Sequence, residues 1–180
     1  MPKTAKPPAD SAAILAAGYH TTPLGSFWSQ WTAQGLFRIE WNAPQQVAMG
    51  GIDPQAEKRL EERVAHFDTV LNAYFAGQFD ALNTVEIDPV GWTPFYREVY
   101  RACRAIPAGQ TLSYGALAER AGRPAAARAV GQAMATNRVM WIIPCHRVVA
   151  SSGRLHHYGG PGGVTMKRWL LDHERAKVQP

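Results

Sequence analysis

The segment that most constrains this chain is a short apolar run that ends in a proline and leads directly into a cysteine and a histidine. It reads Met140-Trp141-Ile142-Ile143-Pro144-Cys145-His146-Arg147-Val148-Val149. A short apolar run bounded by a structure breaker predicts a buried strand or core segment. Because Pro144 bends the backbone path and lacks a donor, we expect Cys145 to lie in a turn. Only a turn lets Cys145 and His146 cooperate, since neighbouring side chains of a regular strand point to opposite faces.

Cys145 has two interpretations. A neighbouring imidazole can lower the pKa of a cysteine from about 8.5 to roughly 3.5–7.5, and the thiolate is the nucleophilic form. A lone cysteine beside an apolar run can instead be an inert core residue. His146 and Arg147 favour a functional site, because two groups that can carry positive charge fit a core only when they are paired.

Composition argues against several classes of protein. The 180 residues are 46% hydrophobic, which argues against wholesale disorder. No apolar run approaches the ~20 residues of a membrane helix, and the first residues lack the apolar core of a signal peptide. Two distant cysteines, Cys103 and Cys145, form neither a disulfide scaffold nor a zinc-ligand pattern. We therefore expect a cytoplasmic protein with free thiols.

Charge is distributed unevenly along the chain. Residues 1–91 hold 6 Lys/Arg and 10 Asp/Glu, a net charge of −4, whereas residues 92–180 hold 13 Lys/Arg and 4 Asp/Glu, a net charge of +9. This asymmetry predicts two regions with different partners. Nucleic acid is favoured over a merely solvated basic surface for the second region.

The residue patterns predict an α+β fold in three parts. Residues 1–12 are expected to form a flexible tail, residues 13–90 a small N-terminal α+β domain and residues 91–180 a C-terminal helical domain. In the N-terminal domain, residues 25–31 and 36–41 predict a hairpin, and residues 85–87 predict one more strand. Asp53-Pro54 predicts the start of a helix that Gly77 ends.

The C-terminal part predicts a helix-turn-helix. Thr93-Pro94 begins a helix whose apolar stripe contains Cys103, so that cysteine is interpreted as core. A short helix over 115–121, a turn at 122–124 and a helix over about 124–136 give the helix-turn-helix outline. The second of these helices consists mostly of alanine and glycine. Its Arg128 could point into DNA or be an ordinary surface arginine, and the residues alone leave both interpretations open.

The last helix is predicted over about 164–174. Four residues fall on the face expected to be core: Met166, Trp169, Leu170 and His173. Glu174 lies near the predicted end, where an acidic side chain opposes the helix dipole. This local misfit indicates a tertiary partner for Glu174, with a frayed surface glutamate as the simpler alternative.

These motifs resemble the O6-alkylguanine-DNA alkyltransferases, also called methylated-DNA–protein-cysteine methyltransferases. The resemblance covers essentially all of residues 92–180 and extends more weakly into the N-terminal half. It rests on the following segments, in the family's order: Thr22-Pro23-Leu24-Gly25, Leu71-Asn72-Ala73-Tyr74-Phe75-Ala76-Gly77, Ser113-Tyr114, Ala126-Ala127-Arg128-Ala129-Val130-Gly131, Asn137, Pro144-Cys145-His146-Arg147-Val148-Val149, Trp169-Leu170-Leu171 and His173-Glu174.

The resemblance implies a winged helix-turn-helix-like DNA-binding domain and a single-use repair reaction. Cys145 would accept an alkyl group from O6 of guanine, with O4-alkylthymine as a further candidate substrate, after the base leaves the helix stack. His146 would take the thiol proton through a water, and Glu174 would orient the imidazole. Asn137 would support the turn, and Tyr114 would donate a proton to the leaving base.

The resemblance also implies how double-stranded DNA is held. The second helix of the helix-turn-helix would enter the minor groove, with Arg128 filling the gap left by the flipped base. The implied DNA contacts are Tyr114, Gly115, Arg123, Arg128, Met134 and Ser151. The implied base pocket comprises Val148, Tyr158, Gly159 and Gly160. No cofactor and no metal are implied, and we expect a monomer in the absence of DNA.

Three other functions remain as alternatives: a non-catalytic lesion-binding protein that recruits excision repair, a Cys–His hydrolase or acyltransferase, and a sequence-specific transcription factor. The chain also departs from the family's common pattern. The loop between Tyr158 and Lys167 is two residues longer, and the N-terminal zinc ligands of some relatives are missing. A cysteine at the central position argues against the non-transferring relatives, which have tryptophan there.

Overall fold

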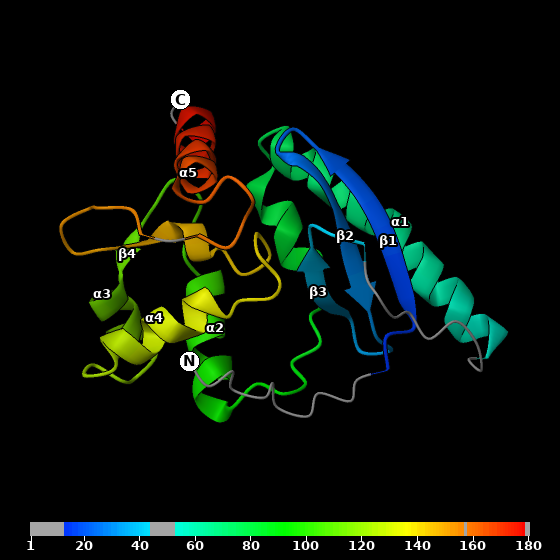
Figure 1. Ribbon diagram of the computed structural model, residues 1–180, viewed down its shortest axis with the longest axis horizontal. Helices are drawn as coiled ribbons and strands as arrows, with labels where there is room; N and C mark the ends of the chain where they lie inside the picture. The colour runs from blue at the N-terminus through cyan, green and yellow to red at the C-terminus, as the bar shows by residue number, and fades with distance from the viewer. Residues whose placement is uncertain (1–12, 44–52, 157, 179–180) are drawn as a thin grey trace, which may run out of the picture.

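The computed structural model describes residues 13–43, 53–156 and 158–178, and it has the predicted α+β fold. Its N-terminal half holds an antiparallel sheet in the order β1-β2-β3 (Ala16–Thr22, Gly25–Trp31 and Leu36–Glu40) and helix α1 (Pro54–Phe75). The C-terminal half holds α2 (Pro94–Arg104), α3 (Tyr114–Arg120), α4 (Ala127–Ala135) and α5 (Val164–Val178). Figure 1 shows the sheet with α1 on one side of the molecule and the C-terminal helices on the other. The predicted tail lies outside the described residues.

The predicted hairpin is confirmed as β2 and β3, but the sheet contains one strand more than we predicted. Strand β1 pairs with β2 along its whole length. Its sequence consists mostly of small and polar residues and lacks the alternation of large apolar side chains that predicts a strand. Gly18 explains part of this composition, because a Cβ there would overlap Cγ1 of Val64 on α1. The helix therefore packs closely over β1.

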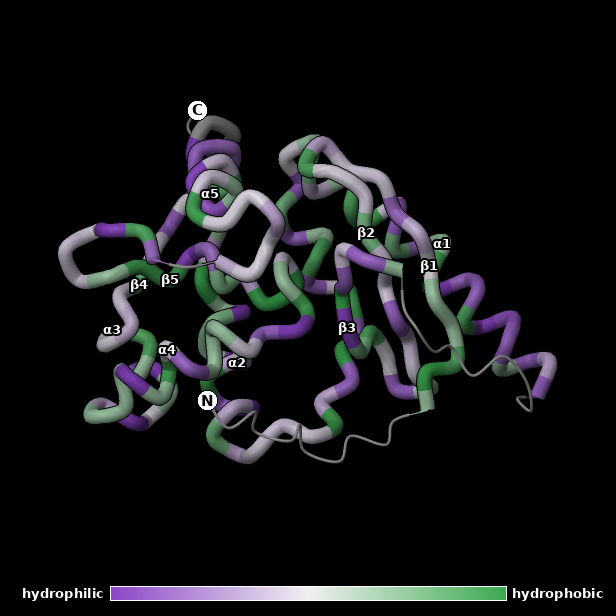
Figure 2. The backbone as a smooth tube through the Cα atoms, viewed as in Figure 1, coloured by the Kyte–Doolittle hydropathy of each residue, from purple (hydrophilic) through white to green (hydrophobic). Residues whose placement is uncertain are grey.

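Helix α1 begins and ends where the sequence predicts. The Asp53 carboxylate accepts from the Gln55 backbone N–H at 3.3 Å, and Gly77 follows the helix at a φ of 103°. Along α1, hydrophobic and hydrophilic stretches alternate in Figure 2. Its buried residues face the core: Leu60, Phe67, Val70, Leu71 and Tyr74.

The strand predicted at residues 85–87 does not form. Residues 79–84 make a short 3-10 helix, η1 (Phe79–Thr84), and the chain then makes a single bridge from Ile87 to Leu36. Leu36 N–H donates to the Glu86 carbonyl at 2.9 Å, and Asp88 N–H donates to the Leu36 carbonyl at 3.0 Å. The apolar alternation of this segment therefore reflects a local contact with the edge of β3.

A polar relay, buried at His20 and Ser29 and exposed at Asp68, ties α1 to the sheet. His20 Nδ1 lies 2.7 Å from Asp68 Oδ1, and His20 Nε2 lies 2.6 Å from Ser29 Oγ. The Trp31 indole donates to the same hydroxyl at 2.7 Å. These are the residue types of a hydrolase triad, but Ser29 is 0% exposed and so out of reach of any substrate. The relay is structural and joins β1, β2 and α1.

The predicted helix-turn-helix is formed by α3 and α4. Ser113 Oγ caps α3 by accepting from the Ala116 backbone N–H at 3.0 Å. Gly122 has a φ of 72° and provides the turn. Helix α4 starts at Ala127, later than predicted, because the residues after Pro124 first form a turn in which Ala126 N–H donates to the Arg123 carbonyl at 2.9 Å. A parallel pair of short strands, β4 (Leu112–Ser113) and β5 (Val148–Val149), braces the base of α3.

Helix α5 differs from the prediction in length and in the burial of its predicted core face, where His173 is only partly buried. It continues to Val178, so Glu174 lies in its interior. Met166 and Leu170 are buried as expected, whereas Trp169 is 38% exposed and was wrongly placed in the core. Its ring instead stacks on His173 at 4.9 Å between ring centroids, where a large apolar side chain covers its neighbour at the surface.

One hydrophobic cluster joins the two halves. The Trp141 ring packs against Phe27 at 5.0 Å, Trp41 at 5.8 Å and Phe75 at 6.1 Å, all of which belong to the N-terminal half. Cys103 is 0% exposed in this cluster, as predicted for a core residue. In the parts of the chain that the structure describes, no helix combines the length and apolar character needed to cross a bilayer. The boundary at residue 90 stays a prediction.

Candidate active site

The apolar run that precedes Cys145 is buried but is not a strand. Val139, Met140, Trp141, Ile142 and Ile143 are each at most 6% exposed, and the run folds back so that Ile143 N–H donates to the Val139 carbonyl at 3.0 Å. Trp141 adopts a φ of 71°, which is strained for a bulky side chain. After Pro144, the predicted turn is the short 3-10 helix η2 (Cys145–Arg147).

Asn137 holds this turn from inside. Its Nδ2 donates to the Ile143 carbonyl at 2.9 Å and to Cys145 Sγ at 3.2 Å, while its Oδ1 accepts from Val139 N–H at 3.1 Å. One side chain therefore fixes both ends of the folded-back run and also contacts the sulfur. Asn137 follows Thr136, the C-cap of α4, so the same residue joins the helix-turn-helix to the cysteine turn.

His146 and Glu174 make the contact that the resemblance implies. His146 Nε2 lies 2.8 Å from Glu174 Oε1, and both side chains are fully buried. Since Glu174 is ionised and can only accept, the proton of the neutral imidazole lies on Nε2. Within the described residues, His146 Nδ1 has no hydrogen-bond partner. Burial lowers the pKa of His146, so the ring is a neutral base with a free lone pair.

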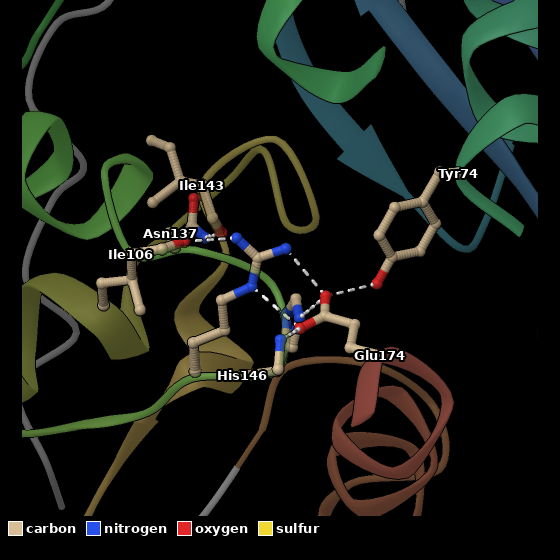
Figure 3. Close-up of polar contacts among 8 residues, drawn as sticks. Tyr74, Ile106, Asn137, Ile143, His146 and Glu174 are labelled. Carbon is tan, nitrogen blue, oxygen red and sulfur yellow. Dashed lines mark hydrogen bonds and ion pairs between the residues drawn. The ribbon is translucent and has the colours of Figure 1, made fainter. Parts of the chain in front are cut away.

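Arg147 completes the pairing of Glu174. Its Nε donates to Oε2 at 2.9 Å and its Nη2 donates to Oε1 at 2.8 Å, while Nη1 donates to the Ile106 carbonyl at 2.6 Å. Burial alone would raise the pKa of Glu174, but the hydrogen bonds and charges of His146 and Arg147 outweigh it and hold that pKa well below its usual range. Figure 3 shows Glu174 at the centre of these contacts. The predicted tertiary partner of Glu174 is thus confirmed.

The thiol itself differs from our expectation. We expected a neighbouring imidazole to lower the pKa of Cys145, but burial raises it and outweighs the opposing effects of Asn137 and Lys167. Within the described residues, the Cys145 thiol and the His146 imidazole form no direct hydrogen bond with each other. The resting group is a neutral thiol, which must lose its proton during the reaction.

Cys145 lies at the wall of a cavity of about 410 Å³. The cavity opens along the helix-turn-helix and is lined by Tyr114, Ala127, Arg128, Gly131, Met134, Ala135, Cys145, His156, Tyr158, Gly159 and Lys167. Small side chains on α4 leave this space open. A volume of this size suits one small-molecule ligand or one nucleobase.

Several predicted site residues line this cavity, namely Tyr114, Arg128, Met134, Cys145, Tyr158 and Gly159. The predicted pocket residues Val148 and Gly160 are not among its lining residues. The Val148 carbonyl accepts from Lys167 Nζ at 2.6 Å, and a Cβ on Gly160 would overlap Met166 Sδ. Val148 therefore acts through the cavity residue Lys167, whereas Gly160 packs against Met166.

Three predicted DNA contacts lie away from the cavity. Arg123 is exposed in the turn between α3 and α4, Ser151 is exposed in the turn after β5, and Gly115 is partly buried in the first turn of α3. Their roles stay predictions. No cluster of three or more His, Cys, Asp or Glu side chains in the described residues could hold a metal ion.

Sequence reasoning missed Lys167 and Tyr74. Lys167 is 1% exposed, lines the cavity and has a pKa lowered by burial. Its spacing from Leu170, Leu171 and Glu174 places it on the buried face of α5, and that was the available signal. Tyr74 donates to Glu174 Oε1 at 2.8 Å from α1, a contact across 100 residues that no local pattern reveals.

Relatives share both the sequence and the fold. The family model described as "6-O-methylguanine DNA methyltransferase, DNA binding domain" matches residues 94–176. A methylated-DNA–protein-cysteine methyltransferase of Shigella flexneri is 40% identical over 159 residues, which cover 85% of this chain and 91% of that protein. The Salmonella typhimurium protein of the same name is 42% identical over 159 residues, with the same coverage.

Solved structures give the same result. The Mycobacterium tuberculosis O6-methylguanine methyltransferase matches with a TM-score of 0.68 and 34% identity over 91% of this chain and 96% of that chain. The M. tuberculosis protein OGT, solved in complex with DNA, matches with a TM-score of 0.67 and 35% identity over 89% of this chain and 93% of that chain. Fold and site define an α+β protein that presents a thiol beside a helix-turn-helix. The chain belongs to the methylated-DNA–protein-cysteine methyltransferase family.

Proposed function

We propose that this protein repairs DNA directly, by transferring the alkyl group of O6-alkylguanine to its own Cys145. The observation that supports this most strongly is the position of the thiol. Cys145 Sγ lies at the wall of a cavity bounded by the helix-turn-helix and is held there by Asn137. O4-alkylthymine, which has the same alkyl–oxygen bond, is a further candidate substrate.

The transfer is a single displacement. Sγ attacks the alkyl carbon, the sulfur–carbon bond forms and the bond from carbon to O6 breaks. The electron pair stays with the guanine, which takes up a proton, and Tyr114 at the cavity wall is our candidate donor. The thiol proton goes to Nδ1 of His146 through a water. The thioether is stable, so each molecule acts once.

The substrate is a base turned out of duplex DNA. A buried thiol cannot reach a stacked base, so the base must enter the cavity, which costs a few kcal/mol. Small residues on the outer face of α4 suit a minor groove only ~6 Å wide, and Arg128 beside the cavity is our candidate to occupy the vacated stack. The relative solved with DNA supports this partner. We place the monomeric protein in the cytoplasm, where Cys103 and Cys145 stay reduced.

A mass measurement tests the proposal. Duplex DNA with one O6-methylguanine should add the mass of one methyl group to the peptide containing Cys145, and none to the peptide containing Cys103. Cys145→Ser should bind the same DNA without gaining mass. An unmodified Cys145 despite tight binding would favour the lesion-binding alternative. Repeated turnover of an ester would favour a hydrolase.

A further inference from the structure

The N-terminal half places one hydroxyl group in the active-site network. Tyr74, near the end of α1, donates from its hydroxyl to Glu174 Oε1 at 2.8 Å, and both residues are 0% exposed. Figure 3 shows Tyr74 approaching Glu174 from the side of α1, while His146 lies on the other side of the carboxylate.

Packing alone does not require a hydroxyl at this position. The Tyr74 ring contacts Phe75 at 5.2 Å, Phe79 at 5.4 Å and His173 at 6.0 Å between ring centroids. A phenylalanine would make the same ring contacts. The specific contribution of tyrosine is therefore the bond to Glu174, which burial strengthens because water cannot replace it.

Oε1 of Glu174 accepts from three donors at once. These are His146 Nε2, Arg147 Nη2 and the Tyr74 hydroxyl, each at 2.8 Å. Oε2 accepts from Arg147 Nε at 2.9 Å and more weakly from the Gly109 backbone N–H at 3.4 Å. Each donor compensates part of the carboxylate charge. The negative charge that remains uncompensated on the side of His146 determines how strongly the imidazole binds a second proton, and so sets the pKa of His146.

We propose that Tyr74 is a positioning residue: its hydroxyl fixes Oε1 of Glu174 and limits the negative charge facing His146, so that the imidazole stays a neutral base. The N-terminal half thereby takes part in the chemistry of the C-terminal half. The kinetic consequence rests on the proposed alkyl transfer, whereas the effect on His146 does not.

The direction of the effect follows from the groups around His146. Glu174 of α5 and Arg147 of η2 face it directly, Lys167 of α5 and the thiol of Cys145 lie nearby, and the Tyr158 ring lies 6.5 Å away. Glu174 is the only anion in this set when the thiol is protonated. Without the Tyr74 hydroxyl, Glu174 presents more negative charge, so the pKa of His146 rises.

The first test needs no substrate. The imidazole titration of His146 is followed by NMR in the wild-type protein and in Tyr74→Phe, with the signal assigned from its loss in His146→Gln. We expect Tyr74→Phe to raise the pKa of His146 by roughly half a unit. The matched control is Tyr100→Phe, which removes another buried hydroxyl, one that donates to the Ala133 carbonyl at 2.8 Å. That control should leave the His146 titration unchanged.

The second test follows alkyl transfer from O6-benzylguanine as a function of pH. Where His146 is neutral in both proteins, the two rates should agree. On the acidic side, Tyr74→Phe should be slower by about threefold, since half a pKa unit changes the neutral fraction by that factor. A merely structural role would lower the rate equally at every pH.

The outcomes separate the two proposals. A wild-type protein that transfers no alkyl group overturns the proposed function and leaves the NMR titration to decide on Tyr74. An unchanged His146 titration in Tyr74→Phe, or one shifted equally in Tyr100→Phe, overturns the role of Tyr74. Thermal unfolding of both variants checks that each is folded.

Discussion

The carboxylate of Glu174 is fully buried and accepts hydrogen bonds from three side chains: Tyr74 of α1, and His146 and Arg147 of η2. Its pKa lies below that of a glutamate in the unfolded chain, about 4.3. A group of this kind stabilises the fold fully above the unfolded pKa, and the contribution is lost as pH falls through that value towards the folded pKa. Acid should therefore destabilise the protein through this site.

We predict that Glu174→Gln lowers the free energy of unfolding by about 3–5 kcal/mol at neutral pH, because it leaves the Arg147 charge buried without an ionic partner. The free energy of unfolding of the variant should also fall less steeply than that of the wild type below about pH 4.3. Urea unfolding at a series of pH values measures both effects. Asp172→Asn, an exposed carboxylate on the same helix, is the control and should change neither. A neutral-pH loss no larger than that of the control would contradict this prediction.

Asn137 allows a second prediction with an almost isosteric change. Asn137→Asp places a negative charge beside Cys145 Sγ, so we expect the pKa of the thiol to rise further and alkyl transfer to slow at least tenfold. Thiolate absorbance during a pH titration and the rate with O6-benzylguanine measure the two effects. Asn83→Asp, at an exposed position, should behave as the wild type. Faster transfer by Asn137→Asp would refute this account of the amide.

Part of the site was predictable from single residues and part was not. Pro144 indicates the turn at Cys145, and Arg147 indicates a paired cation, because breakers and buried charges have local signatures. The spacing of Lys167 indicates only that it lies on the buried face of α5. Neither Lys167 nor Tyr74 reveals its partner, because Val148 and Glu174 come close to them only in the folded chain. The raised pKa of the thiol depends on burial and was equally hidden.

Helix α4 is the element at which DNA binding and alkyl transfer can be tested separately. Arg128 and Gln132 are both exposed on it, four residues apart, but only Arg128 lines the cavity. We predict that Arg128→Ala lowers the repair rate on duplex DNA by at least tenfold while leaving the reaction with free O6-benzylguanine nearly unchanged, because the free base needs no extrusion. Gln132→Ala is the matched control and should have a smaller effect on duplex repair. Equal losses on both substrates would exclude a role for Arg128 in base extrusion.

Elements with capping residues were the ones that the sequence predicted well. Asp53-Pro54 and Thr93-Pro94 mark the starts of α1 and α2 within one residue, because a side-chain oxygen and a fixed φ act locally. Strand β1 was missed because it owes its place to pairing with β2 and to the close approach of α1 at Gly18. Residues 85–87 were wrongly predicted as a strand, since alternation does not reveal that the segment pairs with the edge of β3 at a single bridge only.

Across the whole molecule, Trp141 links the strained active-site run to the aromatic cluster of the N-terminal half. We predict that Trp141→Ala costs about 3–5 kcal/mol of stability through lost packing. Trp141→Gly should cost less than Trp141→Ala by about 1 kcal/mol, although glycine is the smaller residue, because it adopts a positive φ without strain. Chemical denaturation of the two variants measures the difference. A glycine variant less stable than the alanine variant would contradict this prediction.

The two cysteines differ in their access to solvent. Cys103 is enclosed in the shared core, whereas Cys145 opens into the cavity. A small electrophile such as iodoacetamide thus meets one thiol in the native chain and two in the unfolded chain. Counting the labelled sulfurs at successive times would therefore report the rate of global unfolding through the labelling of Cys103, without any added dye or engineered probe.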